Sequence, residues 1–165
     1  MRVYLPATTS MLRRLVERRE IGPAPLTAFA VTPGLREWYV DDDVEALEYA
    51  ATLEASRASL RLLAVDASAD ARRVVLAADV ADELVTVRDD LDRGVVRIAG
   101  PVSFGQVASA HVDDRSAEPA VRAAAEAIDE ADLGDAAAQD RVDDAEGFEL
   151  GWYAAQEIVA LLELL

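Results

Sequence analysis

The 165-residue chain contains no cysteine and no lysine, and its one imidazole side chain is His111. The absence of cysteine excludes disulfide bonds, thiolate nucleophiles, zinc–thiolate sites and iron–sulfur clusters. Such a chain is compatible with a reducing compartment. The single histidine also restricts acid–base catalysis, because any serine nucleophile has only one imidazole to activate it.

Long apolar segments are absent as well. No window reaches the roughly 18 uninterrupted apolar residues of a membrane span. The amino-terminal sequence MRVYLPATTSMLRR lacks the apolar run of about 7–15 residues and the small-residue cleavage site of a secretory signal. We therefore expect no membrane partner and a cytoplasmic location.

The short sequence motifs of common catalytic, nucleotide-binding and metal sites do not occur. The chain has no GxxxxGK[ST], GxGxxG, GxSxG, HExxH or CxxC sequence. The sequence therefore indicates no reaction, and we expect no catalytic constellation, no cofactor and no metal.

The composition is that of a folded protein. Apolar residues make up 52% and charged residues 29% of the chain, a balance that is typical of globular rather than disordered proteins. A length of 165 residues fits one domain, since domains commonly contain about 100–150 residues. We expect a single domain over residues 1–165.

Acidic residues outnumber basic ones by 32 to 16, which gives a net charge of −16. The imbalance is uneven: residues 1–36 carry six arginines and two acids, whereas residues 101–165 carry three arginines and fifteen acids. Binding to DNA or RNA depends on neutralising phosphates, so we expect no nucleic-acid partner. The acidic half suits a basic protein partner, or simply promotes solubility.

The hydrophobic pattern predicts strands mixed with helices. Strand-like segments lie at residues 2–5, 26–31, 73–80, 84–88, 95–99 and 108–113. Helical patterns cover a turn from Pro33 and residues 44–63, 118–130, 136–146 and 148–165, and Thr8 is among the candidate caps of another helix that follows Pro6. We predict an α+β fold with a small mixed sheet of about five strands, built from two β-α-β-like units, with helices packed on it and a helical carboxyl-terminal third.

His111 is the centre of one candidate site. In an extended strand His111 and Asp113 point to the same side, so Asp113 or Asp114 is placed to orient the imidazole. Asp113, Asp114 and Glu118 also offer the hard oxygens that Mg²⁺ or Ca²⁺ prefers, although no calcium-loop spacing is present. The structural alternative is an ordinary strand histidine followed by carboxylates that cap a helix starting near Pro119.

Two aromatic pairs form the other candidate site. Trp38 and Tyr39 occur in LREWYV, and Trp152 and Tyr153 occur in ELGWYAAQEI. Adjacent residues on a helix diverge by about 100°, so both rings of a pair cannot be fully buried on one face. One member of each pair either lines a groove or interface, or packs in the core with its polar atom bonded to a partner.

Several segments resemble those of a family of small acidic actinobacterial proteins of unknown function. They are RVYLPAT (2–8), PLTAFAVTPGLREWY (25–39), RRVVLAADV (72–80), AHVDD with AEPAV (110–121) and ELGWYAAQEI (149–158). The resemblance spans nearly the whole chain and implies a bacterial, cytoplasmic, single-domain protein. It implies no reaction, ligand or catalytic residue.

Two functional hypotheses follow. The first is a non-catalytic module that binds another protein, or a second copy of itself, through a surface that contains the aromatic pairs within acidic surroundings. The second is a small enzyme or ligand-binding protein with a cleft near His111, Asp113, Asp114 and Glu118.

Overall fold

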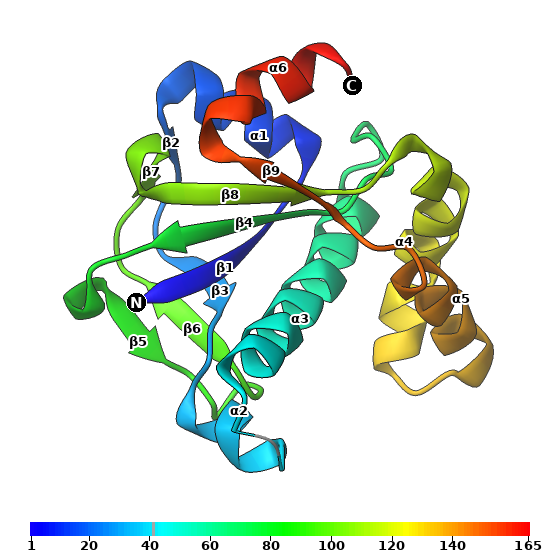
Figure 1. Cartoon of the computed structure of the whole chain (residues 1–165). Coiled ribbons are helices and arrows are strands. Elements are labelled where there is room, and N and C mark those ends of the chain that lie inside the picture. The colour runs from blue at the N-terminus through cyan, green and yellow to red at the C-terminus, as the bar shows by residue number, and fades with distance from the viewer. Residues whose placement is uncertain (41) are drawn as a thin grey trace.

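A seven-stranded β-sheet lies at the centre of the computed structural model, which describes residues 1–40 and 42–165 (Figure 1). The strands of the described chain are β1 (Arg2–Ala7), β2 (Glu20–Ile21), β3 (Leu26–Phe29), β4 (Val74–Asp79), β5 (Val85–Val87), β6 (Val95–Ile98), β7 (Val102–Ser103), β8 (Val107–Val112) and β9 (Gly151–Ala154). The α-helices are α1 (Thr9–Arg18), α2 (Pro33–Trp38), α3 (Val44–Val65), α4 (Glu118–Asp132), α5 (Ala136–Glu146) and α6 (Ile158–Glu163). Single-turn 3-10 helices cover Asp82–Leu84, Phe104–Gln106, Arg115–Ala117 and Ala155–Glu157.

The order of the strands across the central sheet is β5-β6-β3-β1-β4-β8-β9, and β2 and β7 form a separate two-stranded sheet. The α+β class is as predicted, but the sheet is larger than the expected five strands. It is also not mixed: all the described strand pairs are antiparallel, including β1 with β3, on either side of the first helix. The chain therefore returns next to β1 without the parallel crossover of a β-α-β unit.

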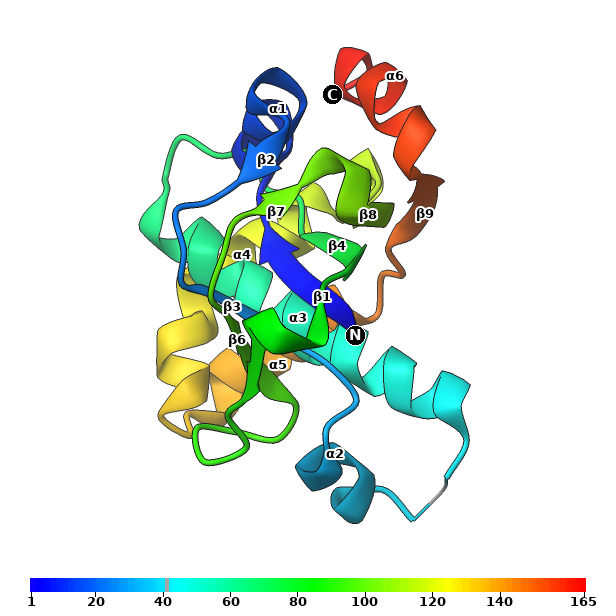
Figure 2. The ribbon, with the colours of Figure 1, turned by 90° about the vertical axis from the view of Figure 1, so that its left-hand side faces the viewer.

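The two faces of the sheet are covered by different helices (Figure 2). Along β1, Val3 and Leu5 belong to a cluster that includes buried residues of α1 and α6. Tyr4, between them, belongs to a second cluster with alanines of α3. Successive side chains of a strand point to opposite faces, so α1 and α6 cover one face and α3 covers the other.

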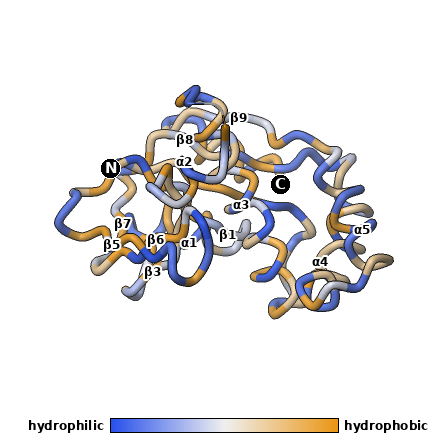
Figure 3. The backbone as a smooth tube through the Cα atoms, turned by 90° about the horizontal axis from the view of Figure 1, so that it is seen from below, coloured by the Kyte–Doolittle hydropathy of each residue, from blue (hydrophilic) through white to orange (hydrophobic). Residues whose placement is uncertain are grey.

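Helices α4 and α5 form an antiparallel pair beside the sheet, at the end of α3 (Figure 3). Their buried residues, among them Val121, Ile128 and Val142, pack with Leu60 and Leu63 of α3 in a third apolar cluster. The predicted helix at residues 136–146 agrees with α5, and α4 continues two residues beyond its predicted end. Among the described helices, none is long and apolar enough to cross a membrane.

Short polar side chains mark the starts of the first three helices. The hydroxyl of Thr8 accepts a hydrogen bond from the backbone N–H of Met11 at 3.2 Å, so Thr8 is the cap of α1. Thr32 caps α2 in the same way, and Asp43 caps α3. Asp43 is the last of three consecutive aspartates, of which Asp41 lies outside the described residues, and acidic residues at this position favour the start of a helix.

Pro6 does not end the first strand as predicted, because β1 continues through it to Ala7. Proline has no N–H and is poorly tolerated where a strand is paired on both sides. The ladder between β1 and β3 contains only the pair of Tyr4 and Phe29, whereas Pro6 lies opposite Val75 of β4. Pro6 has no partner in β3, so its missing N–H removes no hydrogen bond from the ladder between β1 and β3.

The prediction of one helix from Phe148 to the chain end was wrong. The segment first forms β9, which pairs with β8, and only then turns into α6. Gly147 and Gly151 weaken a helix at its start, and tryptophan and tyrosine favour strands. The sequence pattern alone does not show that β8 has a free side for this segment to pair with.

Candidate functional site

The edge strand β9 places Trp152 directly opposite His111 of β8. Directly opposite residues of an antiparallel pair share one face of the sheet. His111 is in turn opposite Val75, which packs with α3, so Trp152 and His111 both lie on the α3 face. Tyr153 lies on the other face against the core, whereas Trp152 is 62% exposed.

Successive side chains of a strand alternate between its two faces, so the rings of Trp152 and Tyr153 point about 180° apart. The angle of about 100° expected for neighbours on a helix does not apply to this pair. One ring is exposed and one is packed, which agrees with the expectation that both cannot be buried on one face.

The outer side of β9 ends the sheet, because β9 is the last strand in the sheet order. In the described part of the chain, β8 is the only strand that pairs with β9. The backbone N–H of Ala154 donates to the carboxylate of Glu157 at 3.0 Å, which ends the strand. The remaining outward backbone groups of this short strand are available for pairing with another chain.

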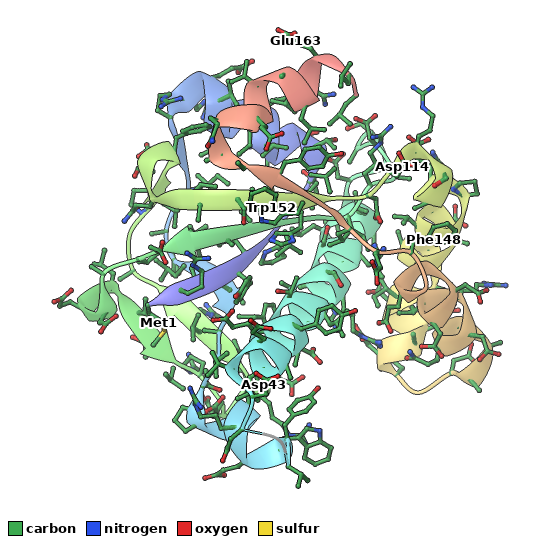
Figure 4. The ribbon with its side chains drawn as sticks, in the orientation of Figure 1. Met1, Asp43, Asp114, Phe148, Trp152 and Glu163 are labelled. Atoms are coloured by element: carbon green, nitrogen blue, oxygen red, sulfur yellow. The ribbon has the colours of Figure 1, made fainter. Side chains whose placement is uncertain are left out.

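A cavity of about 210 Å³ lies next to β9, on the α3 face of the sheet. We call it the α3–β9 cavity. Its lining consists of Tyr49, Thr52, Leu53 and Ser56 of α3, Arg73 and His111 from the sheet side, and Glu146 with residues 148–150 from the segment that joins α5 to β9. Figure 4 shows Phe148 in this segment and Trp152 in the strand that follows it.

Arg73 of the cavity lining forms a buried ion pair with Asp113. Nε and Nη2 of Arg73 each donate to an oxygen of Asp113 at 2.8 Å, and the backbone N–H of Arg73 adds a third bond at 2.8 Å. Nη2 also donates to the carbonyl of Phe148 at 2.8 Å. The pair therefore positions the segment that leads into β9, and its charges balance each other.

The imidazole of His111 is half-buried in the cavity lining, and burial lowers the pKa of His111. The ring is consequently neutral at pH 7. Its Nε2 lies 3.4 Å from the hydroxyl of Ser109, a buried residue on the same face of β8. Ser109, His111 and Asp113 thus share a face, but Asp113 bonds to Arg73 and Ser109 lies outside the cavity lining.

The other acidic candidates lie elsewhere. Asp114 caps the 3-10 turn that precedes α4, where it accepts from the hydroxyl of Ser116 at 2.8 Å, and this bond lowers the pKa of Asp114. Glu118 accepts a hydrogen bond from Arg72 at 3.1 Å. The structure thus brings Asp113 close to the cavity but leaves Asp114 and Glu118 out of its lining. Within residues 1–40 and 42–165, no group of three potential ligands is arranged to hold a metal ion.

Trp38 and Tyr39 lie on a different surface, at the end of α2, far from β9 (Figures 1 and 2). Trp38 is 61% exposed and Tyr39 is 40% exposed. The guanidinium of Arg93 lies over the Trp38 ring, 3.4 Å from its centroid, a cation–π contact within the chain. The two aromatic pairs therefore do not form one continuous site.

Two carboxylates line the α3–β9 cavity and a third lies at the end of β9. Burial raises the pKa of Glu146, although the guanidinium groups of Arg57 and Arg73 oppose the increase. Glu149 lies in the cavity lining and Glu157 beside Ala154. The site therefore combines two exposed aromatic rings, Tyr49 and Phe148, with an acidic rim.

Most of the cavity lining was not foreseen from the sequence. Tyr49 and Leu53 lie about a hundred positions before Phe148 in the sequence, and the three residues belong to no motif. One signal was available for part of it: Tyr49 and Leu53 are large apolar residues spaced four apart on the side of α3 away from its buried alanines, so they share one exposed helix face.

The model of a family described as a family of unknown function, DUF6912, matches residues 1–162 of the chain. No curated protein and no solved structure gives a match. The match covers nearly the whole chain and adds no reaction or ligand to the geometry described above.

Proposed function

We propose that this chain, which belongs to the DUF6912 family of unknown function, is a non-catalytic binding module of the bacterial cytoplasm that docks a basic segment of another protein along β9. The docked segment adds a strand to the sheet, and Trp152 anchors it. The observation that carries the proposal is the exposed Trp152 side chain on the last strand of the sheet.

The backbone of an edge strand supports this mode of binding. An extended segment that pairs with a free edge gains main-chain hydrogen bonds, and neighbouring side-chain sites give specificity. The sheet has a second edge at β5, but that strand contains only Val85–Val87 and no aromatic residue. The β9 edge is the better candidate because a tryptophan and a cavity lie beside it.

The side chain of Trp152 supports the choice of anchor. Tryptophan is among the residues that contribute most to binding energy at protein interfaces. Trp38 is equally exposed, but Arg93 covers one face of its ring and α2 offers no free sheet edge. We propose Trp38 and Tyr39 as a secondary contact, used only by a partner large enough to extend to α2.

Charge favours a basic partner over a second copy of this chain. Glu146, Glu149 and Glu157 lie around the proposed contact, and the whole chain carries −16. Pairing two β9 strands about a two-fold axis would bring these carboxylates together, which is unfavourable. A segment rich in arginine or lysine would gain from the same field.

The alternative, an enzyme or ligand-binding protein with a cleft near His111, has less support. His111 does line a cavity, but the hydrogen bonds of Asp113 go to Arg73 and leave the imidazole without an orienting carboxylate among the described residues. Asp114 and Glu118 are engaged by Ser116 and Arg72 outside the cavity.

The test uses the fact that the chain has only two tryptophans. In a Trp38→Phe variant, Trp152 is the sole tryptophan fluorophore. The probe is a nonapeptide, Gly-Ser-Val-Arg-Val-Arg-Val-Ser-Gly, blocked at both ends. We expect the peptide to shift the Trp152 emission and to move the backbone amide signals of β8 and β9 in an NMR titration.

Two controls make the test specific. The same peptide with glutamate in place of arginine is expected to bind at least about tenfold more weakly. Trp152→Ala is expected to weaken binding by a similar factor, whereas Trp38→Ala, which removes an equally exposed ring, leaves it unchanged. Equal binding of both peptides, or amide shifts confined to other parts of the fold, would reject the proposal.

A further inference from the structure

We propose that the α3–β9 cavity binds the cationic end of an arginine or lysine side chain. The inference rests on the proposed function for the origin of that side chain, a segment docked along β9. In this proposal the cavity selects a cationic residue at one position of the partner segment. Main-chain pairing along β9 alone gives no such selectivity.

The size of the cavity points to a single side chain. Pockets for drug-sized ligands usually measure about 300–1,000 Å³. The α3–β9 cavity has about 210 Å³ and opens beside the segment that runs into β9. His111 of the lining is opposite Trp152, so the cavity reaches β8, one strand in from the edge on which the partner docks.

The walls of the cavity suit a cation. Tyr49 is 59% exposed and Phe148 is 39% exposed, although both line the cavity. Aromatic rings attract ammonium and guanidinium groups through their quadrupole, and cages of such rings are a known way to recognise cations. Two rings from segments about a hundred residues apart in sequence therefore flank one small space.

The balance of charge in the lining is negative. Arg73 is neutralised by Asp113 at 2.8 Å, and the neutral His111 adds no charge. Glu146 has Arg57 at the limit of an ion pair, 4.0 Å, but that guanidinium hydrogen-bonds to Asp132 and Gln139 at 3.1 Å.

No hydrogen bond or ion pair involves the Glu149 side chain within the described residues. Glu149 therefore has no cationic partner there, and the ion-pair partner of Glu146, Arg57, is 4.0 Å away. The two carboxylates of the lining, Glu146 and Glu149, would repel an anionic ligand and attract a cationic one.

The experiment compares the arginine nonapeptide with versions in which one arginine is replaced by citrulline, which keeps the shape and removes the charge. Lysine is the second cationic probe. We expect wild type to bind the arginine and lysine peptides about tenfold or more tightly than the citrulline peptide at one of the two positions.

The double variant E146Q/E149Q is expected to lose most of this preference. The matched control, E17Q/E20Q, makes the same change of charge on exposed residues near α1 and should keep it. Tyr49→Leu should reduce the preference, while Tyr49→Phe, which retains the ring, should not. Equal affinity for arginine and citrulline, or a full preference in E146Q/E149Q, would overturn the inference.

The experiments can reject the cavity assignment and the edge-docking proposal separately. If the peptides move the β9 amide signals without any preference for arginine, edge docking stands and the cavity assignment is wrong. If no peptide moves those signals, edge docking is wrong, and N-acetylarginine methylamide then tests the cavity alone. Shifts of the His111 ring signals with this probe support the assignment, and their absence overturns it.

Discussion

The guanidinium of Arg73 holds the carboxylate of Asp113 by two parallel hydrogen bonds of 2.8 Å, in a place where the two side chains are only 2% and 0% exposed. The same guanidinium bonds the carbonyl of Phe148, 75 residues further along the chain. One buried pair thus connects β4, the end of β8 and the approach to β9.

Removing one member of this pair should be strongly destabilising. Asp113→Ala leaves a buried guanidinium without its counter-charge, and we expect a loss of about 3–5 kcal/mol in the free energy of unfolding. Urea denaturation followed by circular dichroism measures the change.

The double variant R73M/D113L provides the control for that prediction. Because it removes both charges, it should be less destabilised than D113A alone. A loss below about 1 kcal/mol in D113A would contradict the role given to the pair.

Replacing the carboxylate of Asp89 should loosen the contact between the β5–β6 turn and α2. Asp89 accepts hydrogen bonds from the hydroxyl of Thr32 at 2.6 Å and from the backbone N–H groups of Gly34 and Gly94 at 2.9 and 3.0 Å. We expect Asp89→Asn to lower the free energy of unfolding by about 1 kcal/mol at pH 7, since the site is partly exposed.

Acid titration of Asp89 gives a second readout. Burial disfavours its charged form, but the three hydrogen bonds outweigh this and lower the pKa of Asp89. The stabilisation is therefore present above the unfolded pKa of about 3.9 and is lost as pH falls through the lower folded value. The difference in stability between wild type and D89N should shrink below about pH 4, and a constant difference would argue against the bonds.

The single histidine makes the stability of this protein depend on pH in the neutral range. Burial lowers the pKa of His111 below its ordinary value of 6.5, so the unfolded chain binds its proton first as pH falls. Stability is then fully present above about pH 6.5 and decreases toward the lower folded pKa. Urea denaturation between pH 8 and 5 should show this decline in wild type and a smaller one in His111→Gln.

Two carboxylates change the pH dependence of stability in the opposite direction to His111 in part of that pH range. Burial raises the pKa of Glu54 and of Glu146, so these groups take up protons earlier in the folded state. Both are present in wild type and in H111Q, and the difference between the two curves isolates the histidine. Identical curves would show that the imidazole is as well hydrated in the folded state as in the unfolded state.

The two aromatic residues of β9 should differ in their effect on stability. Tyr153 packs against the core cluster beneath α1 and α6, and we expect Tyr153→Ala to cost about 2 kcal/mol. Trp152→Ala removes a ring that is 62% exposed and should change the free energy of unfolding by less than about 0.5 kcal/mol. Thermal and urea denaturation of both variants measures the contrast, and equal losses would place Trp152 in the core.

The parts of the fold that depend on nearby residues were predictable from the sequence. Thr8 caps α1 because its hydroxyl reaches an N–H three residues away. The helix α5 and the strands β5 and β6 likewise follow from patterns within about fifteen residues, and their positions agree with the predicted segments.

The candidate site was less predictable because its parts meet only through the sheet. The strand character of Gly151–Ala154 depends on a free side of β8, which the local sequence does not reveal. His111 and Trp152 were both singled out from the sequence, but nothing in the pattern placed them opposite each other. Asp113 was also singled out, yet its partner Arg73 is 40 residues away and carried no signal.

The α4–α5 hairpin leaves the sheet at the end of β8 and returns at the start of β9, the neighbouring strand. Its two ends are thus close together, and the entropy cost of closing such an excursion rises only slowly with its length. We therefore expect a change in the length of this hairpin to leave the strand ladder intact. Length variation among relatives should therefore concentrate between Asp114 and Gly147, while the spacing within β8 and β9 stays fixed.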